Sequence, residues 1–293
     1  VAGSAWSATI EIQVADGPGE GFNDATPADP VGGNTGTTLG EQRLIAFEYA
    51  ASIFEQLLDS DVTIVINAKF DPLTCSQFSG TLGSAGAVTY FANFPNAPLA
   101  STWFPVALAN AYANSDLLPG DADINATFNS SVNGNVNCLN GADFYLGLDN
   151  NPGFNDVDLV PVLLHEFAHG LGFATLVNRS TGVPTSGLFD VYSLFLHDVE
   201  IGKDWVDMSD AERAASSIND PNLVWTGETV TNAFPTVPLS AGTNGGFLRM
   251  FAPDPLIGGS SVSHWSTTAT PNLLMEPSIN DDLTDDIDLT RDL

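Results

Sequence analysis

The chain has 293 residues, which is enough for one large domain or two fused subdomains around a sizeable core. It carries 7 Lys and Arg residues against 36 Asp and Glu residues, for a formal net charge of −29. Because so acidic a surface repels phosphate groups and anionic headgroups, we exclude nucleic acids and membrane surfaces as partners. We interpret the carboxylates as a solvated surface that keeps the protein dispersed, with calcium binding as the alternative.

Three features indicate a secreted protein without a membrane span. The chain opens at Val1 without a methionine or a basic and then apolar leader, which predicts a mature, processed form. The two cysteines, Cys75 and Cys138, are predicted to form one disulfide. The most apolar stretch, residues 159–177, has charged and histidine side chains at its centre, which argues against a membrane helix.

The first half of the chain mixes strand and helix patterns. Apolar residues from Leu44 to Leu58 recur at steps of three and four, as on one face of a helix. The run from Val62 to Phe70 is rich in β-branched residues, as in a buried strand. In chain order we predict a strand at 7–14, a loop at 15–40, a helix at 40–59, a strand at 62–70, a helix at 103–113, and strands at 122–128 and 143–148.

The second half begins with an apolar helix. Asp158 is a good N-cap before Leu159, and Pro161 is tolerated in a first turn. Residues 189–196 fit either a helix or a strand, and Ser209-Asp-Ala-Glu212 is a capping box that opens a short helix. Since helices and strands mix without regular βαβ alternation, the predicted fold class is α+β.

The apolar helix carries the pattern HEFAH at residues 165–169. Residues four apart lie about 6 Å apart on one helix face, so His165 and His169 can converge on one metal ion. Glu166 is rotated by about 100°, where it can reach a water on that metal but not the metal itself. Zinc lowers the pKa of such a water to about 7, so Glu166 can act as the general base in amide hydrolysis.

The alternative is that both histidines are ordinary core residues whose polar atoms have hydrogen-bond partners within the protein. The helix is apolar nearly all round, so histidine and glutamate side chains in it would be buried, and without partners they would cost several kcal/mol of desolvation. One bound ion removes that cost. We therefore predict one catalytic Zn²⁺ rather than a purely structural role for these side chains.

The third ligand is not at the usual place. Zinc peptidases with a glycine at the position of Gly172 often supply a third histidine three residues later, but Thr175 stands there, and a neutral hydroxyl is a poor zinc ligand. Gly172, or Gly170, is predicted to end the helix in a left-handed turn. His197 and His264 remain as candidates, and His197 lies among large apolar residues that fit an ordinary packed or capping histidine.

Three motifs together carry a family resemblance. HExxHxxGF at 165–173 is followed by Ser263-His-Trp265 and then by Leu273-Leu-Met-Glu-Pro277. This set resembles the leishmanolysin-like branch of the metzincin metallopeptidases, over about residues 156–285. The resemblance implies that His264 is the third metal ligand after an insertion of variable length. It also implies that Met275 forms an apolar floor under the metal.

The resemblance also implies an architecture. It predicts a metzincin-like catalytic unit with a mixed twisted sheet and two long helices in an N-terminal subdomain, residues 1–172. A largely irregular C-terminal subdomain, residues 173–293, would carry the third ligand and the methionine turn. The 143–148 strand would then lie along the cleft rim, where Tyr145 and Leu146 are predicted to bind an extended peptide substrate.

Together these features predict a secreted, monomeric zinc endopeptidase that acts on protein or peptide substrates. A structural Ca²⁺ is an option for the acidic segments at 121–123, 149–158 and 281–288, although solvated loop carboxylates are the competing interpretation. An alternative function is an extracellular metal-containing binding or adhesion module without turnover, and a third is a hydrolase acting on a non-protein amide. The intact Glu166 favours an enzyme.

Overall fold

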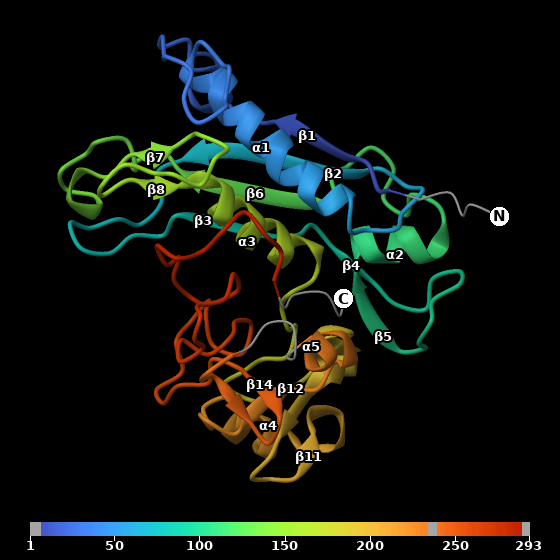
Figure 1. The fold of residues 1–293 in the computed structure, drawn as a ribbon. Coiled ribbons are helices and arrows are strands. Elements are labelled where there is room, and N and C mark those ends of the chain that lie inside the picture. Colours follow the sequence, from blue (N-terminus) through green and yellow to red (C-terminus); the bar gives the residue numbers. More distant parts are fainter. Residues whose placement is uncertain (1–6, 234–238, 289–293) are drawn as a thin grey trace. The chain divides into compact units, whose positions relative to one another are not determined.

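A computed structural model describes residues 7–233 and 239–288. The chain is a mixed α/β protein with five α-helices and several separate sheets in these ranges, which fits the α+β class (Figure 1). It divides into two compact units, neither of which is one continuous stretch. Among the described residues, the first unit holds 7–89, 106–171 and 284–286, and the second holds 90–105, 172–233, 239–283 and 287–288.

The main sheet of the first unit has four strands. In spatial order they are β1 (Ile10–Val14), β2 (Ile64–Asp71), β6 (Ile124–Asn129) and β3 (Gly83–Ala87). β1, β2 and β6 are parallel, whereas β3 runs antiparallel to β6 and forms one edge. Side chains in β2 alternate between buried and half-buried, so one face of the sheet packs on the core while the other meets solvent.

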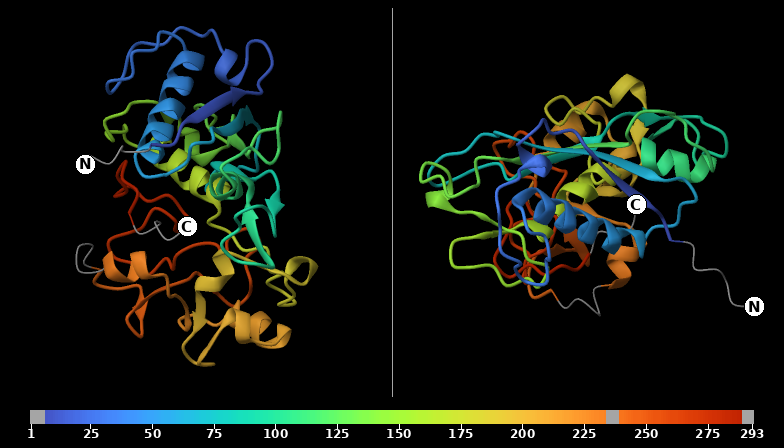
Figure 2. Two further views of the ribbon diagram at one scale, coloured as in Figure 1. Left: turned by 90° about the vertical axis from the view of Figure 1, so that its right-hand side faces the viewer. Right: turned by 90° about the horizontal axis from the view of Figure 1, so that it is seen from above.

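Two helices cover the buried face of this sheet (Figure 2). Helix α1 (Leu39–Glu55) begins at the N-cap Thr38, whose side chain accepts a hydrogen bond from the backbone of Glu41. Helix α3 (Leu159–Leu171) packs against α1, β6 and β3. The Phe47 ring of α1 contacts the Phe128 and Phe167 rings, at centroid distances of 4.9 and 5.9 Å, which places an aromatic core between helices and sheet.

The remaining elements of the first unit are short. They are the 3₁₀ turns η1 (Gly21–Asn23) and η2 (Leu139–Gly141), helix α2 (Val106–Ala113), and the parallel strand pair β7 (Phe144–Tyr145) and β8 (Val157–Asp158). The predicted strand at 143–148 is therefore only two residues long, and it lies outside the main sheet. The edge strand β3 was not predicted, because its sequence Gly-Ser-Ala-Gly-Ala lacks β-branched residues.

The second unit is built from short strands around an aromatic core. Its larger sheet has the order β11 (Lys203–Asp204), β10 (Leu196–Asp198), β12 (Leu223–Trp225), β14 (Phe247–Arg249), β13 (Thr243–Asn244). Its smaller sheet has the order β4 (Tyr90–Phe91), β5 (Thr102–Pro105), β9 (Phe189–Asp190). The rings of Phe173, Tyr192, Trp225 and Trp265 pack on one another at centroid distances of 4.8 to 5.9 Å.

The helices of the second unit are short. They are the 3₁₀ turns η3 (Thr185–Gly187), η4 (Tyr192–Phe195) and η5 (Trp205–Asp207) and the helices α4 (Asp210–Ser216) and α5 (Glu228–Ala233). The predicted capping box is confirmed, because Ser209 and Glu212 each accept a hydrogen bond from the other's backbone. Residues 189–198, for which the sequence favoured neither helix nor strand, contain both a 3₁₀ turn and strands.

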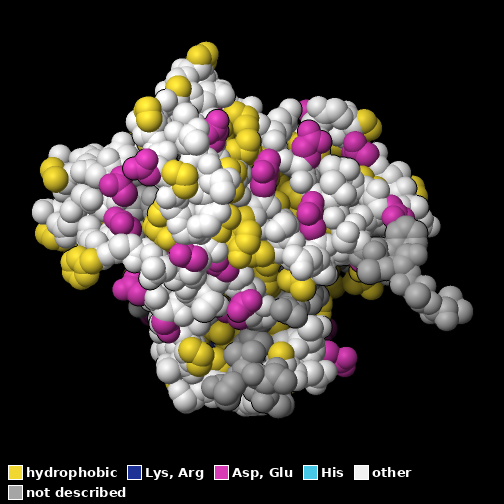
Figure 3. Space-filling view, turned by 45° about the horizontal axis from the view of Figure 1, so that its top comes forward, with side chains coloured by type: hydrophobic (Ala, Val, Ile, Leu, Met, Phe, Trp, Pro, Cys, Tyr) yellow, Lys and Arg dark blue, Asp and Glu magenta, His cyan; other side chains and the backbone are white. Residues whose placement is uncertain are grey.

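Acidic side chains are scattered over the face drawn in Figure 3, in keeping with the net charge of −29. Among the helices of the described ranges, none is long and apolar enough to cross a membrane. On the face drawn in Figure 3, the carboxylates are interspersed with polar and apolar side chains.

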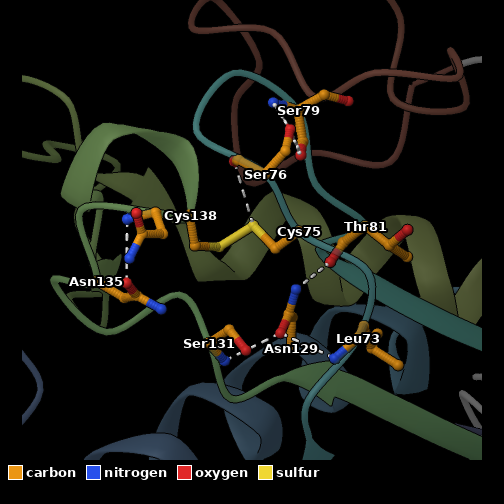
Figure 4. Close-up of a disulfide and its surroundings, with 10 residues drawn as sticks. Leu73, Cys75, Ser76, Ser79, Thr81, Asn129, Ser131, Asn135 and Cys138 are labelled. Atoms are coloured by element: carbon orange, nitrogen blue, oxygen red, sulfur yellow. Dashed lines mark hydrogen bonds between the residues drawn. A yellow bond between two sulfur atoms is a disulfide. The ribbon is translucent and has the colours of Figure 1, made fainter.

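The predicted disulfide between Cys75 and Cys138 is present (Figure 4). It joins the loop that follows β2 to the η2 turn, across a sequence separation of 63. Beside it the buried amide of Asn129 holds the same loop, since it accepts from the backbone N–H of Leu73 at 3.0 Å and donates to the carbonyl of Thr81 at 2.8 Å. A covalent bond and a buried amide thus fix this loop next to β6.

Candidate metal centre

Helix α3 places the HEFAH residues inside the first unit. The Asp158 carboxylate accepts a hydrogen bond from the backbone N–H of Val160 at 3.1 Å, so it caps the helix as predicted. Pro161 lies in the first turn, where its missing N–H has no helical partner to lose. The helix ends before Gly172, whose φ of +132° is costly for any residue with a Cβ. The predicted helix and its glycine end are confirmed.

Gly170 has a different role from the predicted one. It lies within α3, and a Cβ at this position would come within 2.4 Å of the Ile124 side chain on β6. The absence of a side chain therefore lets the last turn of the helix pack closely on the sheet. Gly172 alone terminates the helix.

The two histidines of the helix converge. The Nε2 atoms of His165 and His169 lie 3.1 Å apart. Two nitrogens on one tetrahedral zinc ion are about 3.4 Å apart, because zinc–nitrogen bonds are about 2.0–2.1 Å long. The pair is thus already close to the spacing that a shared zinc ion needs.

Glu166 is buried beside the edge strand β3. Its side chain accepts a hydrogen bond from the backbone N–H of Ala85. Burial raises the pKa of Glu166 to about 8, and the Ala85 N–H opposes this by favouring the ionised form. A cation held by the neighbouring histidines would favour ionisation further. The carboxyl group therefore has a pKa range suited to accepting and returning a proton near neutral pH.

The room for Glu166 is provided by a glycine. A Cβ on Gly83 would lie 2.8 Å from Cγ of Glu166 and 3.1 Å from the Phe128 ring. Any larger residue at this position in β3 would press the glutamate side chain out of place. The edge strand thus positions the predicted general base through one hydrogen bond and one missing side chain.

His264 lies in the loop at residues 260–265, where its Nδ1 is hydrogen-bonded. Its Nδ1 lies 2.8 Å from the carbonyl oxygen of Ser260, and a carbonyl can only accept, so Nδ1 carries the proton. In the neutral ring Nε2 is then the nitrogen that can bind a metal. A second ring nitrogen that donates to a backbone carbonyl is typical of metal-binding histidines.

The structure brings the three predicted ligands together. The nitrogen atoms of His165, His169 and His264 that can bind a metal all lie within 4.8 Å of one another. Three imidazoles form a donor set that zinc favours, and these rings are buried or half-buried. The donor chemistry and the Nδ1 hydrogen bond of His264 both fit a zinc ion.

Thr175 and His197 have partners of their own. The Thr175 hydroxyl bonds to the Asp190 carboxylate at 3.1 Å and to the Ser193 hydroxyl at 2.8 Å, so it belongs to a buried polar network. His197 lies on β10, where its Nδ1 is 2.7 Å from a carboxylate oxygen of Asp204. Neither side chain is part of the three-histidine group.

Met275 lies on a buried turn that is tied to the His264 loop. Its side chain is fully buried, and its carbonyl accepts a hydrogen bond from the backbone N–H of Trp265 at 2.8 Å. The buried carboxylate of Glu276 closes the turn by accepting from the N–H of Leu273 at 2.9 Å. The methionine turn and the residue after His264 are thus directly joined. The role of Met275 under a metal stays a prediction.

Tyr145 and Leu146 are largely engaged in local structure. The Tyr145 hydroxyl donates to Asp149 at 2.6 Å. Leu146 is buried, and its carbonyl accepts from the side-chain amide of Asn34 at 2.7 Å. Their predicted role in substrate binding stays a prediction, and the buried Leu146 side chain offers little surface for it.

The acidic segments remain candidates for calcium only as a prediction. Asp123 is buried, and its carboxylate binds the backbone N–H of Val65 and the side chain of Asn110, which gives it a structural role. Burial is the main cause that raises the pKa values of Asp158 and Asp285 to about 6. Within the described ranges, no carboxylate cluster comparable to the three-histidine group is found.

Several residues around the site could not be found from the sequence. Gly83 and Ala85 contact Glu166 from a strand about 80 positions earlier, and Arg179 and Tyr192 bind the His264 loop from about 80 and 70 positions earlier. Such non-local pairings leave no local pattern. The one available signal was the glycine-rich composition of residues 80–86, which marks a close approach of backbone to another group.

Comparison with known proteins adds no assignment of the site. No family model matches the chain, and no curated protein or solved structure gives a significant match.

Proposed function

We propose that the chain is a zinc-dependent endopeptidase of metzincin type, similar to the leishmanolysin-like branch. The observation that carries the proposal is the grouping of His165, His169 and His264 within 4.8 Å. The second support is the buried Glu166, which directly follows the first of these histidines. Within the proposal, the chain is a secreted enzyme that hydrolyses peptide bonds.

The three imidazoles would hold the ion, with the Nε2 atoms of His165 and His169 already 3.1 Å apart. Zinc in such a site supplies a Lewis acid and makes water nucleophilic near neutral pH. Glu166 takes the proton from the attacking water and returns it to the leaving amine. The Ala85 N–H holds the carboxylate for this task.

The edge strand β3 is the best place for an extended substrate in the first unit. Leu82 and Val88 flank the strand and bond to the β6 segment. The carbonyl of Leu82 accepts from the N–H of Asn129, and the N–H of Val88 donates to the carbonyl of Asp123. Ala85 points its N–H the other way, toward Glu166. Backbone groups on this outer edge can pair with a peptide added as a further strand, next to the general base. This placement is proposed in preference to residues 143–148.

The decisive experiment measures metal content and casein hydrolysis for the purified chain and for Glu166→Gln. We expect about one zinc per chain in both proteins, and hydrolysis lower by about 10²–10⁴-fold in the variant. Glu11→Gln is the matched control, because Glu11 is exposed in β1. Unchanged turnover in Glu166→Gln would refute the general-base role.

A second pair of variants tests the ligand set. His264→Ala should lower zinc affinity sharply, whereas His197→Ala should leave it unchanged, because His197 is bonded to Asp204 outside the group. Zinc bound without any hydrolysis of proteins or peptides would favour a binding or adhesion module. Hydrolysis of small amides but not of peptides would favour a different substrate class.

A further inference from the structure

The loop at residues 260–265, which carries His264, is held at almost every residue. The carbonyl of Ser260 accepts from Nδ1 of His264 at 2.8 Å, and the Ser263 hydroxyl oxygen accepts from the backbone N–H of Thr175 at 3.3 Å. The backbone N–H groups of Val262 and Trp265 donate to the carbonyls of Phe251 and Met275, respectively, at 2.7 and 2.8 Å. The loop therefore has one tightly specified conformation.

That conformation is strained at Val262. Its φ of +71° lies in the left-handed region, and its side chain is fully buried. A β-branched residue adopts this region only where the surrounding structure forces it, and such outliers concentrate at functional sites. The contacts that hold the backbone of Val262 and of its neighbours must therefore supply the free energy that the strain costs.

Two side chains from the segment between the second and third histidines provide these contacts. Nη1 of Arg179 donates to the carbonyl of Ser261 at 2.7 Å, and the hydroxyl of Tyr192 donates to the carbonyl of Val262 at 2.8 Å. Tyr192 is fully buried, with its ring against those of Phe173 and Trp225. Arg179 thus binds the peptide group on the N-terminal side of Val262, and Tyr192 binds the one on its C-terminal side.

Arg179 is distinctive among the basic side chains. The other described Lys and Arg residues pair with an Asp or Glu: Arg43, Lys69, Lys203, Arg213 and Arg249. For Arg179 no carboxylate partner is found in the described ranges, and its guanidinium donates to the Ser261 carbonyl. In so acidic a chain, a half-buried guanidinium on a carbonyl indicates that the loop needs a strong donor there.

We propose that Arg179 and Tyr192 are positioning residues for His264, because they hold the strained 260–265 loop so that its imidazole offers Nε2 to a metal ion. The inference rests on the proposed function for the identity of the ion as zinc. It gives a role to the segment after Gly172, because both Arg179 and Tyr192 belong to that segment.

Tyr192→Phe and Arg179→Met test the inference with two readouts. The first is Zn²⁺ affinity, measured by competition with a chelating dye. We expect each variant to bind zinc about 10- to 100-fold more weakly, as for other residues that orient metal ligands. The second is amide hydrogen exchange of Val262 and Trp265 in metal-free protein, which should become faster in both variants.

Two matched controls separate positioning from general stability. Arg43→Met removes a guanidinium that also donates to a carbonyl at 2.7 Å, that of Gly21, and Tyr49→Phe removes a hydroxyl from helix α1. Neither residue bonds to the 260–265 loop, so neither substitution should change zinc affinity or the exchange at Val262 and Trp265. A loss of zinc affinity in the controls equal to that in the test variants would overturn the inference.

Val262→Gly keeps the proposal testable if Arg179→Met does not fold. Glycine adopts positive φ without strain, so in this background Tyr192→Phe should weaken zinc binding less than it does alone. Unchanged zinc affinity and unchanged exchange in Tyr192→Phe would overturn the inference while leaving the proposed function intact. If the unsubstituted chain binds no zinc, the proposed function fails, and exchange alone decides whether Arg179 and Tyr192 hold the loop.

Discussion

At the scale of single residues, a glycine shapes the surroundings of Glu166. Gly83 leaves the space that the Glu166 side chain occupies, and Gly86 in the same strand has no atom within 4 Å of the place where a Cβ would stand. The two positions share a strand and a residue type but differ in the space available for a side chain. They form a natural pair for substitution.

We predict that Gly83→Ala destabilises the protein by about 1–3 kcal/mol, because the added methyl group overpacks against Glu166 and Phe128. If Glu166 is the general base as proposed, the substitution should also lower hydrolysis, since the Glu166 side chain is displaced. Gly86→Ala, the control, should leave the free energy of unfolding nearly unchanged. Denaturant unfolding of the three proteins measures the difference, and equal stabilities would show that Glu166 moves aside without cost.

The sequence predicted some site residues and not others for a physical reason. His165, Glu166 and His169 lie within five consecutive residues of one helix, so their spacing alone places the two histidines on one face and Glu166 beside it. His264 could be identified only through its motif, because it lies 95 positions after His169 and no periodicity spans such a distance. Arg179 and Tyr192 had no signal at all, since an arginine or tyrosine in an insertion fits many roles.

At the scale of elements, helix α3 begins at a carboxylate with an unusual pKa. Asp158 caps the helix, and burial raises its pKa to about 6, with the nearby Asp285 adding to the shift. The unfolded chain has an ordinary value near 4. The folded state thus holds the proton more tightly than the unfolded state does. Stability is therefore lost as pH rises from about 4 to about 6.

We predict that metal-free protein unfolds at a higher temperature at about pH 5 than at about pH 7, and that Asp158→Asn reduces this difference. Asparagine keeps an oxygen for the Val160 N–H but has no proton to lose. Asp59→Asn, at an exposed position after helix α1, is the control for the general effect of one charge. An equal reduction in both variants would contradict a specific contribution of Asp158.

Long elements were predicted better than short ones. The helices at Leu39–Glu55 and Leu159–Leu171 match the predicted ranges closely. The first shows several turns of apolar periodicity, and the second is a long apolar run that begins after the capping residue Asp158. The strands of the second unit have two to four residues each, which is too short to show alternation. In the first unit, the strand predicted at 143–148 is only two residues long, and the buried Leu146 directly follows it.

At the scale of the whole molecule, negative charge is barely compensated. Five of the six described Lys and Arg side chains are already paired with a carboxylate, so most Asp and Glu residues have no cationic partner. Such a surface repels itself and destabilises the compact state at low ionic strength. Salt screens this repulsion, since the Debye length falls from about 30 Å at 0.01 M to about 3 Å at 1 M.

We predict that raising NaCl from about 0.01 M to about 1 M increases the unfolding temperature at pH 7. The increase should be smaller at about pH 4, where protonation removes part of the negative charge. Calorimetry at the two pH values measures both effects. An equal salt effect at both values would point to salt exclusion from the surface in place of screened repulsion.

The α+β class followed from the irregular mixture of helix and strand patterns, and the structure agrees at that level. The strand order did not follow, because β6 pairs with β2 and β3 across more than 35 positions, and pairings over such separations are not encoded locally. The finer assignment to the metzincin type remains a proposal that depends on the site.

The interleaving of the two units restricts how the protein can be dissected. A fragment that stops after Leu171 would lack residues 284–286, which pack with the first unit, and would retain residues 90–105, which pack with the second. Neither half of the chain therefore contains one complete unit. Isolated halves would each display surfaces that normally contact missing chain, so they would aggregate or recombine, and biochemical work should use the intact polypeptide.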